Sequence, residues 1–179
     1  MLTARDRDAA RNRVAKLLQK AGIALTGSEA MEIEVADFGL SRLEETGFEV
    51  VVDANTDRVS AKEFVMFPRQ LCPEHRHPPF DGSPGKEETF RCRSGVVYLH
   101  IEGEPTPRPA AQPPAEGVFT VWHEIGLLPG DQHTIMPDTR HWFQAGAEGA
   151  IVSDLSTGST DEHDIFSDPR IQRETQIEV

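Results

Sequence analysis

The sequence has few basic residues, few cysteines and no long apolar run, and each shortage excludes a class of protein. Lysine and arginine number 18 against 30 acidic residues, a formal net charge of −12, which argues against a nucleic-acid partner. No apolar stretch approaches the roughly 20 residues of a membrane span, and the charged segment from Met1 to Leu18 lacks the apolar core of a signal peptide. Because Cys72 and Cys92 make no disulfide framework, we expect a reduced, cytoplasmic protein with no membrane partner.

The 179 residues are enough for one compact domain. Helical spacing is clearest near the N-terminus, where Val14, Leu17, Leu18 and Ala21 recur at intervals of three and four before Gly22. A second, shorter helix is predicted between residues 28 and 36. We therefore expect an N-terminal helical arm over residues 1–36 and a β-barrel over residues 37–179, forming a single domain overall.

Beyond residue 37 the chain consists of short apolar segments separated by Gly, Pro, Asn and Asp. Such a pattern, with turn signals every 8–12 residues or so, predicts an all-β sandwich or small barrel. The expected strands are Phe48–Val52, Glu63–Phe67, Glu88–Cys92, Val96–Glu102, Val118–Leu127, His133–Met136, His141–Gln144 and Ala150–Leu155.

Three of the seven histidines form a candidate metal site with one glutamate. His75 and His77 are two residues apart, so on a strand both would lie on the same face. Glu88 opens a later strand, and His141 opens another after a proline-led turn. Nitrogen and oxygen donors of this kind suit Mn²⁺, Fe²⁺, Zn²⁺, Co²⁺ or Ni²⁺ better than Cu⁺. The other histidines, His100, His123, His133 and His163, are expected outside the set.

The order of these residues resembles the cupin superfamily. His-x-His is followed by Glu88, by Gly95 seven residues later, and by a distant histidine after Pro137. Cupins are double-stranded β-helix, or jelly-roll, barrels that hold a metal inside. The spacing departs from the usual pattern because ten residues separate His77 from Glu88. This departure predicts an inserted loop beside the site.

Longer motifs are similar to those of the D-lyxose ketol-isomerase family. They are CPEHRHP at residues 72–78, GKEETFRCR at 85–93, HWFQAG at 141–146 and DEHDIFSDP at 161–169. The resemblance implies interconversion of D-lyxose with D-xylulose, and of D-mannose with D-fructose, through an enediolate. It also implies that His75, His77, Glu88 and His141 bind a divalent metal, usually Mn²⁺, and that the substrate is a monosaccharide.

An isomerase of this type also needs a base near C1 and C2 of the sugar. Asp154 is the candidate, at a position where the resemblance implies glutamate, and Glu162, Asp164 and Glu174 are the alternatives. Lys62 and Lys86 are expected to donate hydrogen bonds to substrate oxygens.

Two other functions fit the same ligand set. One is an Fe-dependent cupin oxygenase, and the other is a non-catalytic sugar-binding cupin. The polar residues around the ligands favour a polyol substrate and hence the isomerase. A homodimer is expected only by analogy with other barrels of this class.

Overall fold

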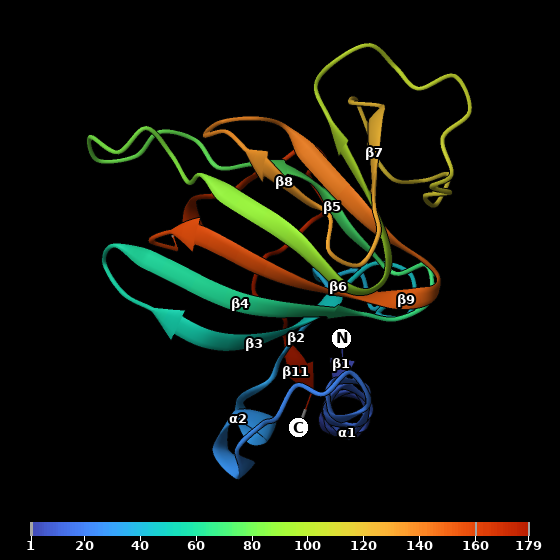
Figure 1. The fold of residues 1–179 in the computed structure, drawn as a ribbon, viewed down its shortest axis with the longest axis vertical. Coiled ribbons are helices and arrows are strands. Elements are labelled where there is room, and N and C mark those ends of the chain that lie inside the picture. Colours follow the sequence, from blue (N-terminus) through green and yellow to red (C-terminus); the bar gives the residue numbers. More distant parts are fainter. Residues whose placement is uncertain (1, 160, 179) are drawn as a thin grey trace.

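The computed structural model describes residues 2–159 and 161–178, which form mostly antiparallel β-structure (Figure 1). The helices are α1 (Ala4–Lys20), α2 (Gly27–Glu32) and the single 3₁₀ turn η1 (Asp161–His163). The strands are β1 (Leu2–Thr3), β2 (Glu34–Ala36), β3 (Phe48–Asn55), β4 (Val59–Met66), β5 (Leu71–Arg76), β6 (Glu88–Ile101), β7 (His123–Leu127), β8 (Gln132–Ile135), β9 (His141–Thr157), β10 (Ile165–Phe166) and β11 (Ile177–Glu178).

The main sheet is organised around β9. One edge of β9 pairs first with β5 and then with β4, while its other edge pairs with β6 along nearly its whole length. The order β10-β5-β9-β4-β3-β2 completes the sheet, and β7 and β8 pair with β6. The sheet curls around a common interior, as the cupin-type fold expected from the sequence requires (Figure 1).

Glycines form the corner that lets β6 and β9 turn back on themselves. Gly95 and Gly149 both have positive φ, and the register between the two strands shifts on either side of Gly95. A Cβ atom on Gly95 would lie 2.0 Å from the carbonyl oxygen of Gly149, so only glycine allows the two backbones to approach this closely. In Figure 1, β9 visibly reverses direction near its middle. Because of this corner, the first half of β6 pairs with the second half of β9, and the second half of β6 pairs with the first half of β9. The first halves of the two strands therefore lie on opposite sides of the interior.

The interior is filled by an aromatic cluster from four different strands. Phe64 lies 4.9 Å from Phe48, 5.8 Å from Phe90 and 6.0 Å from Phe143, measured between ring centroids. All four side chains are buried in one apolar core. Edge-to-face and offset contacts of this kind add to the free energy gained from burial. This aromatic cluster packs next to the polar residues described below and lines part of the same cavity.

Helix α1 covers part of the outer face of the sheet. Thr3 caps its first turn by accepting a hydrogen bond from the backbone N–H of Asp6. Val14 and Leu18 are fully buried and pack in a second apolar cluster with strand residues such as Val65. Among the described residues, no helix combines the length and the apolar character needed to cross a bilayer.

The helix expected over residues 28–36 is shorter in the structure. Thr26 and Glu29 form a capping box that starts α2, and the helix ends at Glu32. Residues 34–36 instead form β2, which pairs with β3. The termini also meet, because β1 and β11 pair in parallel (Figure 1).

Several expected strands prove to be parts of longer ones. Glu88–Cys92 and all of Val96–Glu102 except its last residue belong to β6, and His141–Gln144 and Ala150–Leu155 belong to β9. The glycines between these segments, Gly95 in β6 and Gly146 and Gly149 in β9, form the corner inside each strand rather than a turn that ends it. Strand β5 was not expected, because Pro73 and several charged residues interrupt its apolar pattern. The segment predicted as Val118–Leu127 becomes a strand only from His123.

Candidate metal centre

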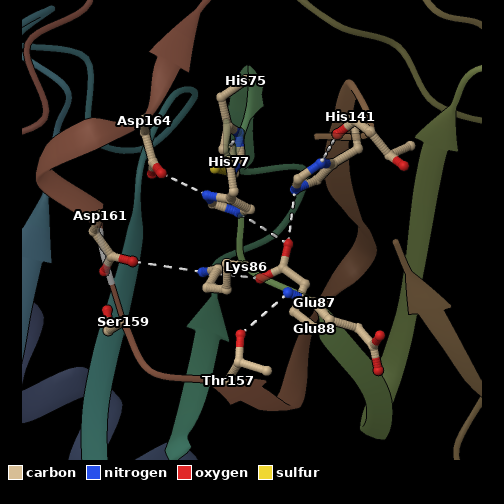
Figure 2. Close-up of polar contacts among 12 residues, drawn as sticks. His75, His77, Lys86, Glu87, Glu88, His141, Thr157, Ser159, Asp161 and Asp164 are labelled. Atoms are coloured by element: carbon tan, nitrogen blue, oxygen red, sulfur yellow. Dashed lines mark hydrogen bonds and ion pairs between the residues drawn. The ribbon is translucent and has the colours of Figure 1, made fainter. Parts of the chain in front are cut away.

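The four residues selected from the sequence as metal ligands come together inside the curled sheet (Figure 2). One donor atom from each of His75, His77, Glu88 and His141 lies within 4.8 Å of the others, and all four residues are buried. His75 on β5 is paired directly with His141 on β9. Glu88 opens β6 and faces them from across the interior. His77 lies one residue beyond the end of β5, so the two histidines are not both within a strand, and the same-face argument for a strand does not apply to the pair.

Each imidazole ring is oriented by a hydrogen bond from its Nδ1 atom. His75 donates to the carbonyl oxygen of Pro73 at 2.8 Å, and His141 donates to that of Thr139 at 2.9 Å. Since a carbonyl oxygen can only accept, Nδ1 must carry the proton and Nε2 is left with its lone pair. Burial, reinforced by His141 and His77, also holds the pKa of His75 well below its usual value. The neutral ring is the form that binds a metal ion.

The chemistry of this donor set fits a divalent cation. The Nε2 atoms of His141 and His77 lie 2.9 Å and 3.2 Å from the same carboxylate oxygen of Glu88. The Nε2 atom of His141 is buried and makes no hydrogen bond. Lone pairs facing a carboxylate oxygen repel each other unless a cation or a proton lies between them. Nitrogen and oxygen donors oriented by outer hydrogen bonds are typical of metal centres in proteins.

Lys62 and Lys86, both selected from the sequence, lie beside this cluster. The Nζ atom of Lys86 is 3.0 Å from Glu88 Oε2 and 3.5 Å from Asp161 Oδ1. The Nζ atom of Lys62 is 2.6 Å from Asp161 Oδ2. Although burial opposes ionisation, Lys86 and Lys62 hold the pKa of Asp161 well below its usual value. One carboxylate therefore joins the two lysines, and its contact with Lys86 is seen in Figure 2.

Asp161 was not selected from the sequence. The one sequence feature that could have pointed to Asp161 is its position as the first residue of the motif DEHDIFSDP at residues 161–169. It also accepts a hydrogen bond from Arg173 at 3.3 Å. Of the alternative bases, Asp164 accepts a hydrogen bond from Nδ1 of His77, whereas Glu162 is exposed.

Asp154 is the remaining candidate from the sequence. It lies on β9 opposite Lys62 of β4, is fully buried, and neither carboxylate oxygen has a hydrogen-bond partner. Burial, together with the nearby charge of Glu88, raises the pKa of Asp154 to about 7. A buried carboxyl group without partners costs stability, so its retention is typical of a residue with a chemical role.

A small cavity of about 30 Å³ adjoins the cluster. Its lining combines charged and aromatic side chains, including Lys62, Lys86, Glu88 and Asp161 together with Phe48, Phe64, Phe90, Phe143 and Phe166. Asp154 is not among the residues that line this small cavity, although its neighbour in the sheet, Lys62, is. The arrangement can bind a small polar molecule between charged groups and a flat apolar surface.

The fold and the site define a cupin-type protein with a buried metal-binding group. No protein-family model matches the chain. In solved structures, the chain is similar to the L-ribose isomerase of Cellulomonas parahominis, with a TM-score of 0.80, 16% identity and coverage of 99% of this chain and 98% of the other. The L-ribose isomerase of Geodermatophilus obscurus is similar to the same extent, with a TM-score of 0.76 and 16% identity over 99% and 98% of the two chains. At 16% sequence identity, the similarity to these two structures shows the fold alone.

Sequence comparison gives the family. The chain is 61% identical to the D-lyxose/D-mannose isomerase of Thermosediminibacter oceani over 168 residues, or 93% of each chain. It is 57% identical to the D-lyxose ketol-isomerase of Cohnella laeviribosi over 171 residues, or 94% of each chain. This chain therefore belongs to the D-lyxose ketol-isomerase family, as the motifs in its sequence predicted.

Proposed function

We propose that this protein interconverts D-lyxose with D-xylulose, and D-mannose with D-fructose, by moving a proton between C2 and C1. The observation that carries the proposal is the buried group of three histidines and one glutamate, each histidine held by its Nδ1 atom. The names of the close relatives support the substrates. That family membership also favours an isomerase over an Fe-dependent oxygenase or a non-catalytic sugar-binding cupin.

We assign His75, His77, Glu88 and His141 as the residues that hold the metal. Four protein donors would fill a tetrahedral Zn²⁺ site but leave positions open on an ion that prefers six ligands, which favours Mn²⁺. When bound, the ion would act as a Lewis acid for the negative charge that develops on the O1 and O2 atoms of the sugar. Co²⁺, Fe²⁺, Ni²⁺ and Zn²⁺ are the alternatives in the metal assay.

The remaining residues bind the sugar and move the proton. Lys62 and Lys86 donate hydrogen bonds to sugar oxygens, and the phenylalanine side of the cavity packs against C–H groups and excludes water. Asp154 is the proposed base, because its carboxylate is buried, free of hydrogen bonds and adjacent in the sheet to Lys62. Glu88 is not available as a base once it binds a metal ion. A cytoplasmic location and a homodimer remain predictions.

A pair of neighbouring variants tests the metal assignment. Glu88 is buried in the cluster, whereas Glu87 is exposed on the opposite face of the same segment. Both variants, Glu88→Gln and Glu87→Gln, remove one charge and keep the side-chain volume. After chelation and reloading with Mn²⁺, we expect Glu87→Gln to bind metal and isomerise D-lyxose like the parent, and Glu88→Gln to do neither. Equal metal binding by the two variants would refute the assignment.

The base is tested by Asp154→Asn, with the exposed Asp57→Asn as its control. We expect Asp154→Asn to keep its metal content but to lose about two to four orders of magnitude in kcat. If its kcat stays within a few-fold of the parent on both D-lyxose and D-mannose, the base is another residue.

A further inference from the structure

The C-terminal segment of residues 161–173, here called the cover, closes the cavity. Asp161, Asp164, Phe166 and Arg173 all line it. The cover is held down by β10, which pairs with β5 at Phe166 and His75, and by Ser167, whose backbone N–H donates to the carbonyl oxygen of Glu74 at 2.9 Å. It therefore docks directly on the strand that carries the first histidine.

With the cover in place the cavity is too small for a sugar. Its volume of about 30 Å³ has room for little more than water, and a monosaccharide is several times larger. A larger hollow of about 540 Å³ lies outside, and its lining shares Asp161 and Arg173 with the inner cavity. Because both spaces are lined by this pair, the cover lies between them. Displacing it would join the two spaces and make room for a sugar beside the metal-binding residues.

The cover also supplies one of the bonds that orient the metal-binding residues. His75 and His141 are each held by a carbonyl oxygen only two residues earlier in their own segment. His77 has no such local partner: its Nδ1 atom bonds Oδ1 of Asp164, 87 residues away in the sequence. Both side chains are almost fully buried, at 3% and 5% exposure. Two rings are thus oriented by the barrel itself, and the third is oriented only when the cover is docked.

We propose that Asp164 is a positioning residue that couples closure of the cover to completion of the metal site. The inference rests on the proposed metal-dependent function and adds a residue and a coupling to it. When the cover opens to admit a sugar, Asp164 leaves His77 and the metal is held less tightly. Because coupling between two equilibria is reciprocal, a bound metal must also favour the closed cover.

Metal affinity measured without sugar tests the positioning role. We expect Asp164→Asn to weaken Mn²⁺ binding by about 10- to 100-fold in competition with a chelator, as for other partners of metal-bound histidines. Glu162→Gln is the matched control, since it removes one charge from an exposed side chain of the same segment, and it should stay within about twofold of the parent. The thermal stability of the metal-free proteins would verify folding.

The outcomes separate this inference from the proposed function. If Asp164→Asn binds Mn²⁺ as tightly as the parent while Glu88→Gln does not, Asp164 has no positioning role but the metal site stands. If the parent itself binds no divalent metal, the proposed function fails as well.

Limited proteolysis tests the coupling. Trypsin can cleave after Arg170, an exposed residue of the cover, and after Arg58, an exposed residue of the β3–β4 turn outside the cover. We expect Mn²⁺ to slow cleavage at Arg170 at least about fivefold in the parent, but not in Asp164→Asn, since proteolysis follows the population of the open form. Cleavage at Arg58 should change much less. Equal protection at both sites, or none at Arg170, would refute the coupling.

Discussion

The buried carboxyl group of Glu49 should make the stability of the protein depend on pH. Glu49 lies on β3 beneath α1, is fully buried, and one of its oxygens has no hydrogen-bond partner. The other oxygen accepts only a long bond of 3.4 Å from Gln70. Burial raises the pKa of Glu49 from 4.5 to about 8, with a smaller contribution of the same sign from Glu44.

The direction of the effect follows from proton binding. Between about pH 4.5 and 8, the folded protein keeps the proton of Glu49 while the unfolded chain has lost it. The free energy of unfolding therefore falls as pH rises, by about 1.4 kcal/mol per pH unit for this one group. Over this whole pH window the free energy of unfolding falls by roughly 3 to 5 kcal/mol because of Glu49. Below pH 4.5 the group is protonated in both states and causes no such loss.

Glu49→Gln removes the titration and keeps the shape. Relative to the parent, the variant should gain roughly 3 to 5 kcal/mol between pH 5 and pH 9, measured by urea unfolding with chelator present throughout. For a protein of this size that corresponds to about 6 to 20 °C in Tm. The exposed Glu32→Gln should show no such change. If the stability difference between Glu49→Gln and the parent is the same at both pH values, the side chain is ionised in the folded protein and the reasoning is wrong.

Two other predictions concern the metal and the corner of the sheet. Removing divalent metal with a chelator should lower Tm, since an ion at 100 times its Kd adds about 2.7 kcal/mol to the native state; an unchanged Tm in calorimetry would contradict metal binding. Gly95→Ala should cost about 3 kcal/mol or more, because the new Cβ would meet the Gly149 carbonyl oxygen at 2.0 Å. Gly130→Ala, also at positive φ but with open space around it, should cost only about 1 to 2 kcal/mol, and equal losses in urea unfolding would contradict the role of the corner.

The cluster of four candidate metal-binding residues could be predicted from the sequence because their residue types and order carry the chemistry. Histidine pairs, a later glutamate and a late histidine are unusual within an all-β pattern, and the motifs around them are long. The helix α1 could also be predicted, because Val14, Leu17 and Leu18 repeat at the spacing of one helix face. Both signals consist of residue types and their spacing along the chain, so they can be recognised without knowledge of the fold.

Other features depend on contacts between distant segments. Two separate strands are expected on either side of Gly95, but close approach to Gly149 makes this glycine the corner of one continuous strand. Strand β5 carries a proline and charged residues, and it is a strand because β9 and β10 supply its hydrogen-bond partners. Pairing across the sheet overrides local propensity in each case.

The sequence by itself determined the fold class, the family and the four residues that cluster as a candidate metal centre, because these depend on the types of residue and their order. Only the tertiary structure decided that Asp161 joins the two lysines and that Asp164 orients His77. These contacts link positions up to 99 residues apart, and many acidic residues could have made them. The physical reason is that docking of the C-terminal segment on β5, rather than any local pattern, selects which carboxylates reach the site.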